Sequence, residues 1–288
     1  DAYIAMNKAR ENKNKYLYSN SNLNKNKNTS NLILLSEIKS AIKKNNFSLY
    51  YQPKLNLRTG KIVGAEALIR WDHYEKGIIS PSNFIPQAEK TALINNLTYW
   101  VIQKAAEDII KFQKDNIDLN IAINIVPRNL KDKEFPRKIE NIINDKNIET
   151  GKIELELTET DIMEELEEAE LILAILSDKG FKISLDDFGT GYSSLSYLKN
   201  LPINNIKIDR SFVRDILVDN KDRQIVKAAV ELGHILNKKV IAEGVETRKG
   251  LELIKNMKCD FVQGYFIGRP LPYEEFKKTY ITYCPANG

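Results

Sequence analysis

Residues that build soft-metal sites or disulfide frameworks are scarce in this chain. Its 288 residues include two cysteines, Cys259 and Cys284, and two histidines, His73 and His234. Two cysteines do not make a disulfide framework, and they fit a reducing compartment. Neither histidine has a second ligand at metal-binding spacing, so a zinc site made from histidine and cysteine is not expected.

Long apolar runs and a secretion signal are missing as well. No stretch reaches the roughly 18 apolar residues of a membrane-spanning helix. The opening DAYIAMNKAR lacks the charged-then-apolar order of a signal peptide. We therefore expect a cytoplasmic chain, with membrane association only through parts of a parent protein that this chain does not contain.

Charge of one sign does not dominate the composition. The net charge is +4 at pH 7, whereas 28% of the residues are charged, and much of the excess lies in the Lys/Asn-rich opening. A solvated surface explains this balance better than a DNA or RNA partner does. The hydrophobic fraction of 42% over 288 residues is enough for one large α/β domain with at most a small attachment.

The opening of the chain differs from the rest. Residues 1–18 carry an apolar pattern and an aromatic-tipped run that predict one helix and a terminal strand of something larger. Residues 19–31, SNSNLNKNKNTSN, have almost no apolar side chains to offset their ordering entropy, so we expect a flexible linker. An amphipathic helix should follow at 32–44.

Beyond the linker, β-branched apolar runs alternate with helical patterns. This alternation favours a TIM-like (β/α)8 barrel over an open sheet. The turn at 57–60 is too short for a parallel crossover, so one strand should run antiparallel to its neighbour. The clearest helix is expected at 219–237. The expected strands cover residues 47–57, 62–71, 121–126, 153–158, 182–186, 205–209, 239–243 and 261–264.

Polar residues that can bind a metal or neutralise charge close these strand-like runs. A barrel brings the residues at one end of its strands together in an active site. Carboxylates gathered there would repel one another unless a cation held them. Oxygen ligands without histidine or cysteine favour Mg²⁺ or Mn²⁺, which suit phosphoester hydrolysis. The residues are Glu66, Asn124, Glu156, Asp186, Asp187, Lys207 and Glu243.

The most specific segment is Asp186-Asp187-Phe188-Gly189-Thr190-Gly191. Adjacent carboxylates at a strand end can bridge two cations roughly 3.5–4 Å apart, and the glycines permit a tight loop beside them. A plain turn is the alternative, and the preceding pair of aspartates makes it the weaker one.

Other acidic positions allow two interpretations. Glu66 and Arg70 share a strand face, either as a structural salt bridge or as partners for a metal and a phosphate. Alternate acids on 153–158 share another face, which is costly when dry. Either that face is wet or Glu156 binds a cation. Lys207 would at minimum neutralise neighbouring acids.

Together these motifs resemble the EAL domain, a family that hydrolyses cyclic di-GMP to linear pGpG. The resemblance runs from about Ser36 to Tyr280 and implies a TIM-like barrel with one inverted strand. The motifs that carry it are Glu66-Ala67-Leu68, Glu156-Leu157-Thr158-Glu159, Asp186-Asp187-Phe188-Gly189-Thr190-Gly191, Lys207-Ile208-Asp209, Glu243-Gly244-Val245-Glu246 and Gln263-Gly264-Tyr265.

The resemblance also implies a role for each matching residue. Two divalent cations, Mg²⁺ or Mn²⁺, would be held by Glu66, Asn124, Glu156, Asp186, Asp187 and Glu243. Catalytic roles would fall to Glu66, Asp187, Lys207 (which assists the attacking water) and Glu159 (which anchors the loop at 188–195). The substrate and the surroundings of the metals would be contacted by Gln52, Arg70, Asp209, Glu246 and Gln263.

Residues 1–18 resemble the closing helix and strand of a GGDEF domain. The expected organisation is a GGDEF remnant at 1–18, the linker at 19–31 and an EAL phosphodiesterase domain at 32–283. The family resemblance further implies cyclic di-GMP as the ligand and a homodimer formed through the EAL domain.

Two functions from different classes stay open. The first is an active phosphodiesterase, and the second is a catalytically silent module that binds cyclic di-GMP or a protein partner. No expected metal ligand is missing from the sequence, which favours the enzyme. A purely structural barrel would keep an uncompensated cluster of acids.

Overall fold

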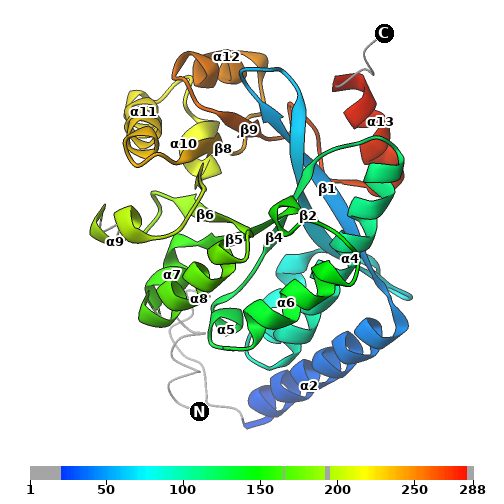
Figure 1. The fold of residues 1–288 in the computed structure, drawn as a ribbon. Helices are drawn as coiled ribbons and strands as arrows, with labels where there is room; N and C mark the ends of the chain where they lie inside the picture. The colour runs from blue at the N-terminus through cyan, green and yellow to red at the C-terminus, as the bar shows by residue number, and fades with distance from the viewer. Residues whose placement is uncertain (1–20, 165, 192–194, 284–288) are drawn as a thin grey trace.

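A closed sheet surrounded by helices dominates this computed structural model, which describes residues 21–164, 166–191 and 195–283 (Figure 1). The expected GGDEF remnant at 1–18 lies outside the described residues. The strands are β1 (Phe47–Asn56), β2 (Ile62–His73), β3 (Gly77–Ile79), β4 (Asn120–Asn124), β5 (Ile153–Thr158), β6 (Lys182–Phe188), β7 (Asn205–Ile208), β8 (Lys239–Ala242), β9 (Phe261–Gln263) and β10 (Leu271–Pro272).

The barrel closes through one inverted strand. From β2 through β4, β5, β6, β7 and β8 to β9, each strand is parallel to the next. β1 is antiparallel to both β2 and β9 and joins them, while β3 and β10 add to β2 and β1 from outside the ring. The expected TIM-like barrel with one antiparallel strand is therefore confirmed.

A tight turn makes the inversion of β1 possible. The side chain of Asn56 accepts hydrogen bonds from the backbone nitrogens of Arg58 (2.9 Å) and Thr59 (3.0 Å). Gly60 then takes a left-handed conformation with φ 68°, which costs glycine little. Because the turn holds so few residues, the chain can only reverse into the neighbouring position of the sheet.

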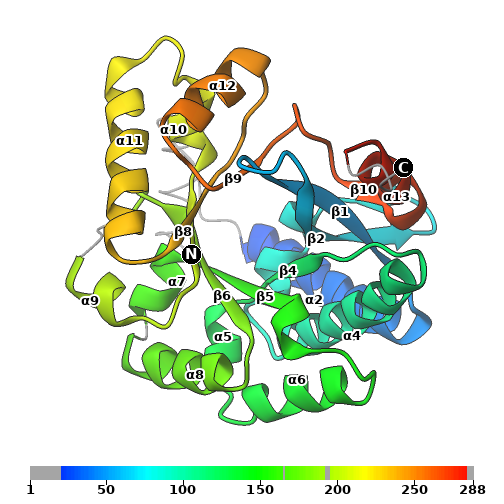
Figure 2. The same ribbon diagram turned by 45° about the horizontal axis from the view of Figure 1, so that its top comes forward.

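Helices cover the outside of the barrel, as Figures 1 and 2 show from two sides. They pack apolar faces against the sheet; on α4, for example, Ile102, Ala105, Ile109 and Phe112 are buried at helical spacing. None of the described helices is both long enough and apolar enough to cross a membrane. The helices are α2 (Ser21–Lys44), η1 (Pro81–Asn83), α3 (Ile85–Ala88), α4 (Leu93–Lys114), α5 (Pro127–Leu130), α6 (Phe135–Asn144), η2 (Thr150–Lys152), α7 (Glu159–Glu164), α8 (Leu166–Asp178), α9 (Leu195–Asn200), α10 (Arg210–Arg214), α11 (Asn220–Ile235), α12 (Arg248–Asn256) and α13 (Tyr273–Tyr283).

The inside of the barrel is polar, unlike the layer between sheet and helices. Lys54 on β1 contacts Glu154 on β5, two strands that are not neighbours, so this ion pair crosses the interior. Lys207 on β7 likewise reaches Glu156 on β5. The polar residues buried on barrel strands or just beyond them include Lys54, Glu66, Glu154, Glu156, Ser184, Asp186, Lys207 and Gln263.

One boundary differs from the expectation. The helix predicted at 32–44 begins at Ser21, so most of the segment predicted as a flexible linker, residues 19–31, is helical. The prediction of a linker rested on composition alone. Asn, Ser and Lys lower helix propensity by only a fraction of a kcal/mol per residue, and a helix already nucleated by packed residues can propagate through such a sequence.

Candidate active site

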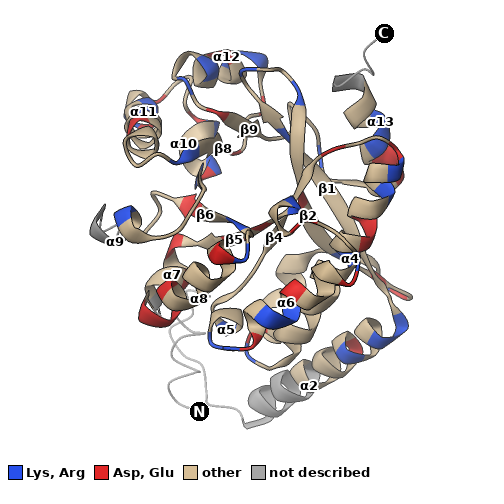
Figure 3. Ribbon diagram, viewed as in Figure 1, with Lys and Arg blue, Asp and Glu red and all other residues tan. Residues whose placement is uncertain are grey.

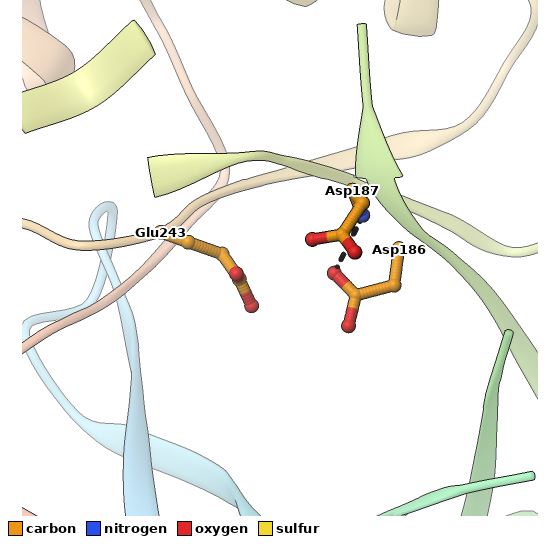
Figure 4. A group of neighbouring side chains, drawn as sticks. All are labelled: Asp186, Asp187 and Glu243. Carbon is orange, nitrogen blue, oxygen red and sulfur yellow. Dashed lines mark hydrogen bonds between the residues drawn. The ribbon is translucent and has the colours of Figure 1, made fainter. Parts of the chain in front are cut away.

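The carboxylates of Asp186, Asp187 and Glu243 converge at one end of the barrel. Asp186 and Asp187 lie at the end of β6, and Glu243 directly follows β8. One carboxylate oxygen from each residue lies within 4.8 Å of the other two. Figure 4 shows Glu243 facing the two aspartates across a gap. The strand-end prediction therefore holds for these three acids.

The backbone at Asp187 lets two consecutive carboxylates face the same gap. Successive side chains of a regular strand point to opposite faces, but Asp187 has a left-handed conformation with φ 53°. Its backbone nitrogen donates a hydrogen bond to Oδ1 of Asp186 at 2.8 Å. Strain of this kind at a non-glycine residue is typical of functional sites.

Lys207 lies at the centre of the acidic cluster. Its Nζ is 2.8 Å from a carboxylate oxygen of each of Glu156, Asp186 and Glu243, and 3.8 Å from Glu66. The side chain is 1% exposed. The surrounding acids raise the pKa of Lys207 well above its usual value, although burial alone would lower it. Lys207 thus neutralises the acids, as predicted, and stays protonated.

Glu66 is held in place by two amide side chains. Asn124 donates to its Oε1 at 2.8 Å and Gln263 donates to its Oε2 at 2.6 Å. Gln263 also donates to Oε1 of Gln52 at 3.2 Å. Burial raises the pKa of Glu66, but Lys207 and these hydrogen bonds outweigh it and leave the pKa lowered. Glu66 is therefore an ionised, oriented carboxylate.

Other acids of the cluster hold protons more tightly than usual. Burial, followed by the charges of Asp186 and Asp209, raises the pKa of Asp187 to about 6. Burial raises the pKa of Glu243 to about 8 even though Lys207 opposes it. Burial likewise raises the pKa of Glu156 well above its usual value. One ammonium group therefore does not balance all the carboxylates.

This excess of carboxylate fits divalent cations. Hard cations such as Mg²⁺ and Mn²⁺ take oxygen ligands, and their charge would displace the protons that the cluster otherwise holds. Asp186, Asp187 and Glu243 offer converging oxygens, and Glu66, Asn124 and Glu156 are linked to the same cluster by the contacts of Glu66 and Lys207.

A cavity of about 490 Å³ opens above the acids. It is lined by Gln52, Glu66, Leu68, Asp187, Asp209, Arg210, Glu243, Gly244, Glu246, Gln263, Gly264 and Tyr265. Most of the residues predicted to contact substrate therefore share one cavity. Arg70 is not among them; its guanidinium lies 5.3 Å from the ring centre of Tyr50 and donates to the backbone oxygen of Ile69 at 2.9 Å.

Two further predicted residues make hydrogen bonds to backbone segments beside the site. Glu159, 1% exposed, accepts a hydrogen bond from the backbone nitrogen of Gly189 at 3.3 Å, as its predicted loop-anchoring role requires. Residues 192–194 of that loop lie outside the described residues. Asp209 accepts from the backbone nitrogen of Ser211 at 3.0 Å and so caps α10.

The sequence interpretation missed the partner of Glu154. The two alternatives for the acidic face of β5 were that it is wet or that Glu156 binds a cation; neither foresaw that Glu154, 2% exposed, pairs with Lys54 at 2.5 Å. Asn205 and Ser184 also donate to Glu154. The only sequence signal for this pair was the alternation of side chains along β1, which puts Lys54 on the same face as Gln52.

Comparison with known proteins identifies the family. The EAL domain model matches residues 35–270. The bifunctional diguanylate cyclase/cyclic di-GMP phosphodiesterase MucR of Pseudomonas aeruginosa is 39% identical over 245 residues, which are 85% of this chain and 36% of MucR. The cyclic di-GMP phosphodiesterase NbdA of the same species is 36% identical over 256 residues, 88% of this chain and 33% of NbdA.

A solved structure agrees with these relatives. The structure described as the PaMucR phosphodiesterase in complex with c-di-GMP has a TM-score of 0.81 and 39% identity, covering 84% of this chain and 99% of that one. The chain spans about a third of the length of the curated relatives MucR and NbdA. With its barrel, its acidic cluster and these matches, the chain belongs to the EAL domain family.

Proposed function

We propose that the chain is a divalent-metal-dependent phosphodiesterase that hydrolyses cyclic di-GMP to linear pGpG. The observation that carries the proposal is the convergence of Asp186, Asp187 and Glu243 within 4.8 Å beneath an open cavity. The relatives MucR and NbdA are named for this activity, and the PaMucR structure is described as a complex with c-di-GMP.

Two cations, Mg²⁺ or Mn²⁺, fit this donor set. They would be held by Glu66, Asn124, Glu156, Asp186, Asp187 and Glu243. When bound, they would supply polarisation of the phosphoester and a lowered pKa of the attacking water. The proposed reaction joins the water oxygen to phosphorus and breaks one phosphodiester bond, so that one ribose hydroxyl leaves with a proton.

The residues of the chain then have separate tasks. Glu66 stays ionised because Asn124 and Gln263 donate to it. Lys207 keeps its proton and orients the water by its charge, since the acids around it raise its pKa. Glu159 fixes the start of the 188–195 loop through Gly189.

Further residues at the cavity are proposed to contact the substrate. Gln52 is fixed by Gln263 at 3.2 Å and by its own donation to the backbone oxygen of Gly268 at 3.3 Å, so it can meet a guanine edge in one orientation. Glu246 lines the same cavity. Arg70 would have to turn from Ile69 toward the cavity to reach a substrate phosphate.

Further proposals carry over from the sequence. They are a GGDEF remnant at 1–18 followed by an EAL domain at 32–283, a homodimer formed through the EAL domain, and a cytoplasmic location. Light scattering of the purified chain tests the dimer, because a monomeric mass at micromolar concentration would contradict it.

The test of the function is metal-dependent turnover. The purified chain is incubated with cyclic di-GMP and Mg²⁺, or with Mn²⁺, with and without EDTA, and the products are separated by chromatography. We expect pGpG only when metal is present. Asp187→Asn should lower turnover by about 100-fold because a metal-binding oxygen is lost. Asp118→Asn, the same change at a residue whose side chain is 81% exposed, should leave turnover unchanged.

Two results would overturn the proposal. If turnover persists in EDTA, the reaction does not depend on a divalent metal. If pGpG forms neither with Mg²⁺ nor with Mn²⁺, while calorimetry still detects cyclic di-GMP binding, the chain is a receptor instead of an enzyme.

A further inference from the structure

A second cavity lies far from the acids, at the other end of the barrel strands. It has a volume of about 400 Å³ and lies where the turn between β1 and β2 meets the starts of β8 and β9 and the end of α12. We call it the basal cavity. It is lined by Asn56, Leu57, Arg58, Lys239, Lys255, Lys258, Cys259, Asp260 and Phe261.

Positive charge surrounds the basal cavity. Arg58, Lys239, Lys255 and Lys258 line it, against one acid, Asp260. Figure 3 shows the basic residues of α12 and of the hairpin between β1 and β2 in blue. A concave surface lined by one sign of charge concentrates ions of the opposite sign.

The single acid, Asp260, pairs with only one of these four cations, Lys239. Asp260 accepts from Lys239 at 2.7 Å, from the backbone nitrogen of Val240 at 3.0 Å, and lies 2.8 Å from Nε2 of His234. Its oxygens are therefore occupied on the side of β8. Among the described residues, Arg58, Lys255 and Lys258 have no side-chain carboxylate within ion-pair distance. Elsewhere on the surface, lysines such as Lys138 pair with acids.

Lys258 occupies a backbone position that disfavours lysine. It has φ 64°, in the left-handed region that follows the end of α12. Glycine and asparagine are preferred at this position after a helix. At four equivalent places among the described residues the chain uses asparagine (Asn45, Asn116, Asn147 and Asn237), and after α8 it uses glycine, Gly180.

Lysine at position 258 is therefore an exception that the end of the helix does not explain. The only other described residue that is neither asparagine nor glycine and has a positive φ is Asp187, in the candidate active site. Strained backbone positions cluster at ligand-binding sites, and Lys258 lines this cavity. In this cavity the ligand must supply negative charge.

We infer that the basal cavity binds a small anion that carries two or more phosphate charges, through Arg58, Lys255 and Lys258. Lysine ammonium groups bind phosphate as point charges, and the arginine fork binds two phosphate oxygens at once. Leu57 and Phe261 give the cavity an apolar wall, so a phosphate compound with an organic part also fits. This site is separate from the proposed cyclic di-GMP site.

Inorganic pyrophosphate is the probe for this inference. The chain is titrated with pyrophosphate by calorimetry at 0.1 M salt in EDTA, which keeps the acidic cluster free of metal. We expect one binding event. Lys258→Asn should weaken it about tenfold or more through loss of a charged contact, while the melting temperature stays the same or rises because asparagine suits this backbone position.

Two control variants make the result decisive. Lys249→Asn is the same change on α12 at an exposed residue outside the cavity lining, and it should leave the affinity unchanged. Arg70→Ala, near the candidate active site, should leave it unchanged too. The inference is overturned if wild type does not bind pyrophosphate, if Lys249→Asn weakens binding as much as Lys258→Asn does, or if Arg70→Ala abolishes it.

Discussion

Among single residues, Tyr51 ties the inverted strand to the helical layer. Its ring packs edge-on against Phe112 with centroids 5.5 Å apart, and its hydroxyl donates to Oδ2 of Asp108 at 2.8 Å. Tyr51, Phe112 and Asp108 are all buried. Asp108 keeps Lys104 and Lys111 as further partners at 3.3 and 2.6 Å, so loss of the hydroxyl would not leave the acid unpaired.

We predict that Tyr51→Phe lowers the free energy of unfolding by about 1 kcal/mol at pH 8, the usual contribution of one buried hydrogen bond. Tyr50→Phe is the matched control, because no described residue forms a hydrogen bond with the Tyr50 hydroxyl. Urea unfolding of both variants measures the difference. Equal stability of Tyr51→Phe and wild type would contradict the assignment.

The same hydroxyl predicts a pH dependence. Burial, followed by the charge of Asp108, raises the pKa of Tyr51 well above its usual 10.0. Below pH 10 the hydroxyl is protonated in both the folded and the unfolded states, and its contribution is complete. Above pH 10 the unfolded state loses the proton first, so the stability advantage of wild type over Tyr51→Phe should fall by about 1.4 kcal/mol per pH unit. A constant difference from pH 8 to pH 11 would disprove this.

At the scale of elements, the end of β9 and the segment after β8 position the acidic cluster together. A Cβ added to Gly264 would lie 2.3 Å from the backbone nitrogen and oxygen of Val245. Val245 donates to the backbone oxygen of Gln263 at 3.2 Å, and Phe266 donates to Val245 at 3.0 Å. Any side chain at 264 must therefore move the segment that carries Glu243.

We predict that Gly264→Ala reduces kcat/KM for cyclic di-GMP by about 100-fold, since a displacement of about 1 Å at a catalytic group has that effect. Gly60→Ala provides the comparison. Gly60 has φ 68° and nothing within 4 Å of an added Cβ, so this variant should lose about 1 kcal/mol of stability through strain alone. It should keep wild-type kcat/KM. If both variants had the same activity, the close approach at Gly264 would not matter to the site.

The elements themselves were largely predictable from the sequence. The strands were found because β-branched runs such as 182–186 and 205–209 are local signals, and the short turn at 57–60 revealed the inverted strand. The brief β3 and β10 were not found, because two or three residues carry no period. The start of α2 at Ser21 was missed because helix propagation depends on neighbouring packed residues more than on composition.

The candidate site was predictable for a different reason. Parallel strands bring their ends together whatever the loops do, so Asp186, Asp187 and Glu243 could be grouped before their distances were known. The contact between Lys54 and Glu154 spans 100 residues along the chain and depends on which strands face each other across the barrel. Sequence period gives the face of each strand but not its partner across the interior.

Across the whole molecule, the barrel interior is a polar layer between the two cavities. Lys54 is two residues from Gln52 on β1, and Glu154 is two residues from Glu156 on β5. The charge of Lys54 acts to lower the pKa of Glu66, and the charge of Glu154 acts to raise the pKa of Glu156. Burial alone would raise the pKa of Glu154, but Lys54 and the hydrogen bonds from Ser184 and Asn205 lower it. Glu154 is therefore held ionised in the interior by Lys54 together with Ser184 and Asn205.

This dependence gives a double-variant prediction. Lys54→Met leaves Glu154, 2% exposed, as a buried charge without its cation, which should cost about 3–5 kcal/mol of unfolding free energy. Adding Glu154→Gln removes that charge while the amide oxygen still accepts from Ser184 and Asn205. The double variant should therefore recover most of the loss, as measured by urea unfolding at pH 8. If the two changes were additive, the pair would not be the balanced unit that the structure shows, and the stability of the interior would have to come from the apolar layer outside the barrel.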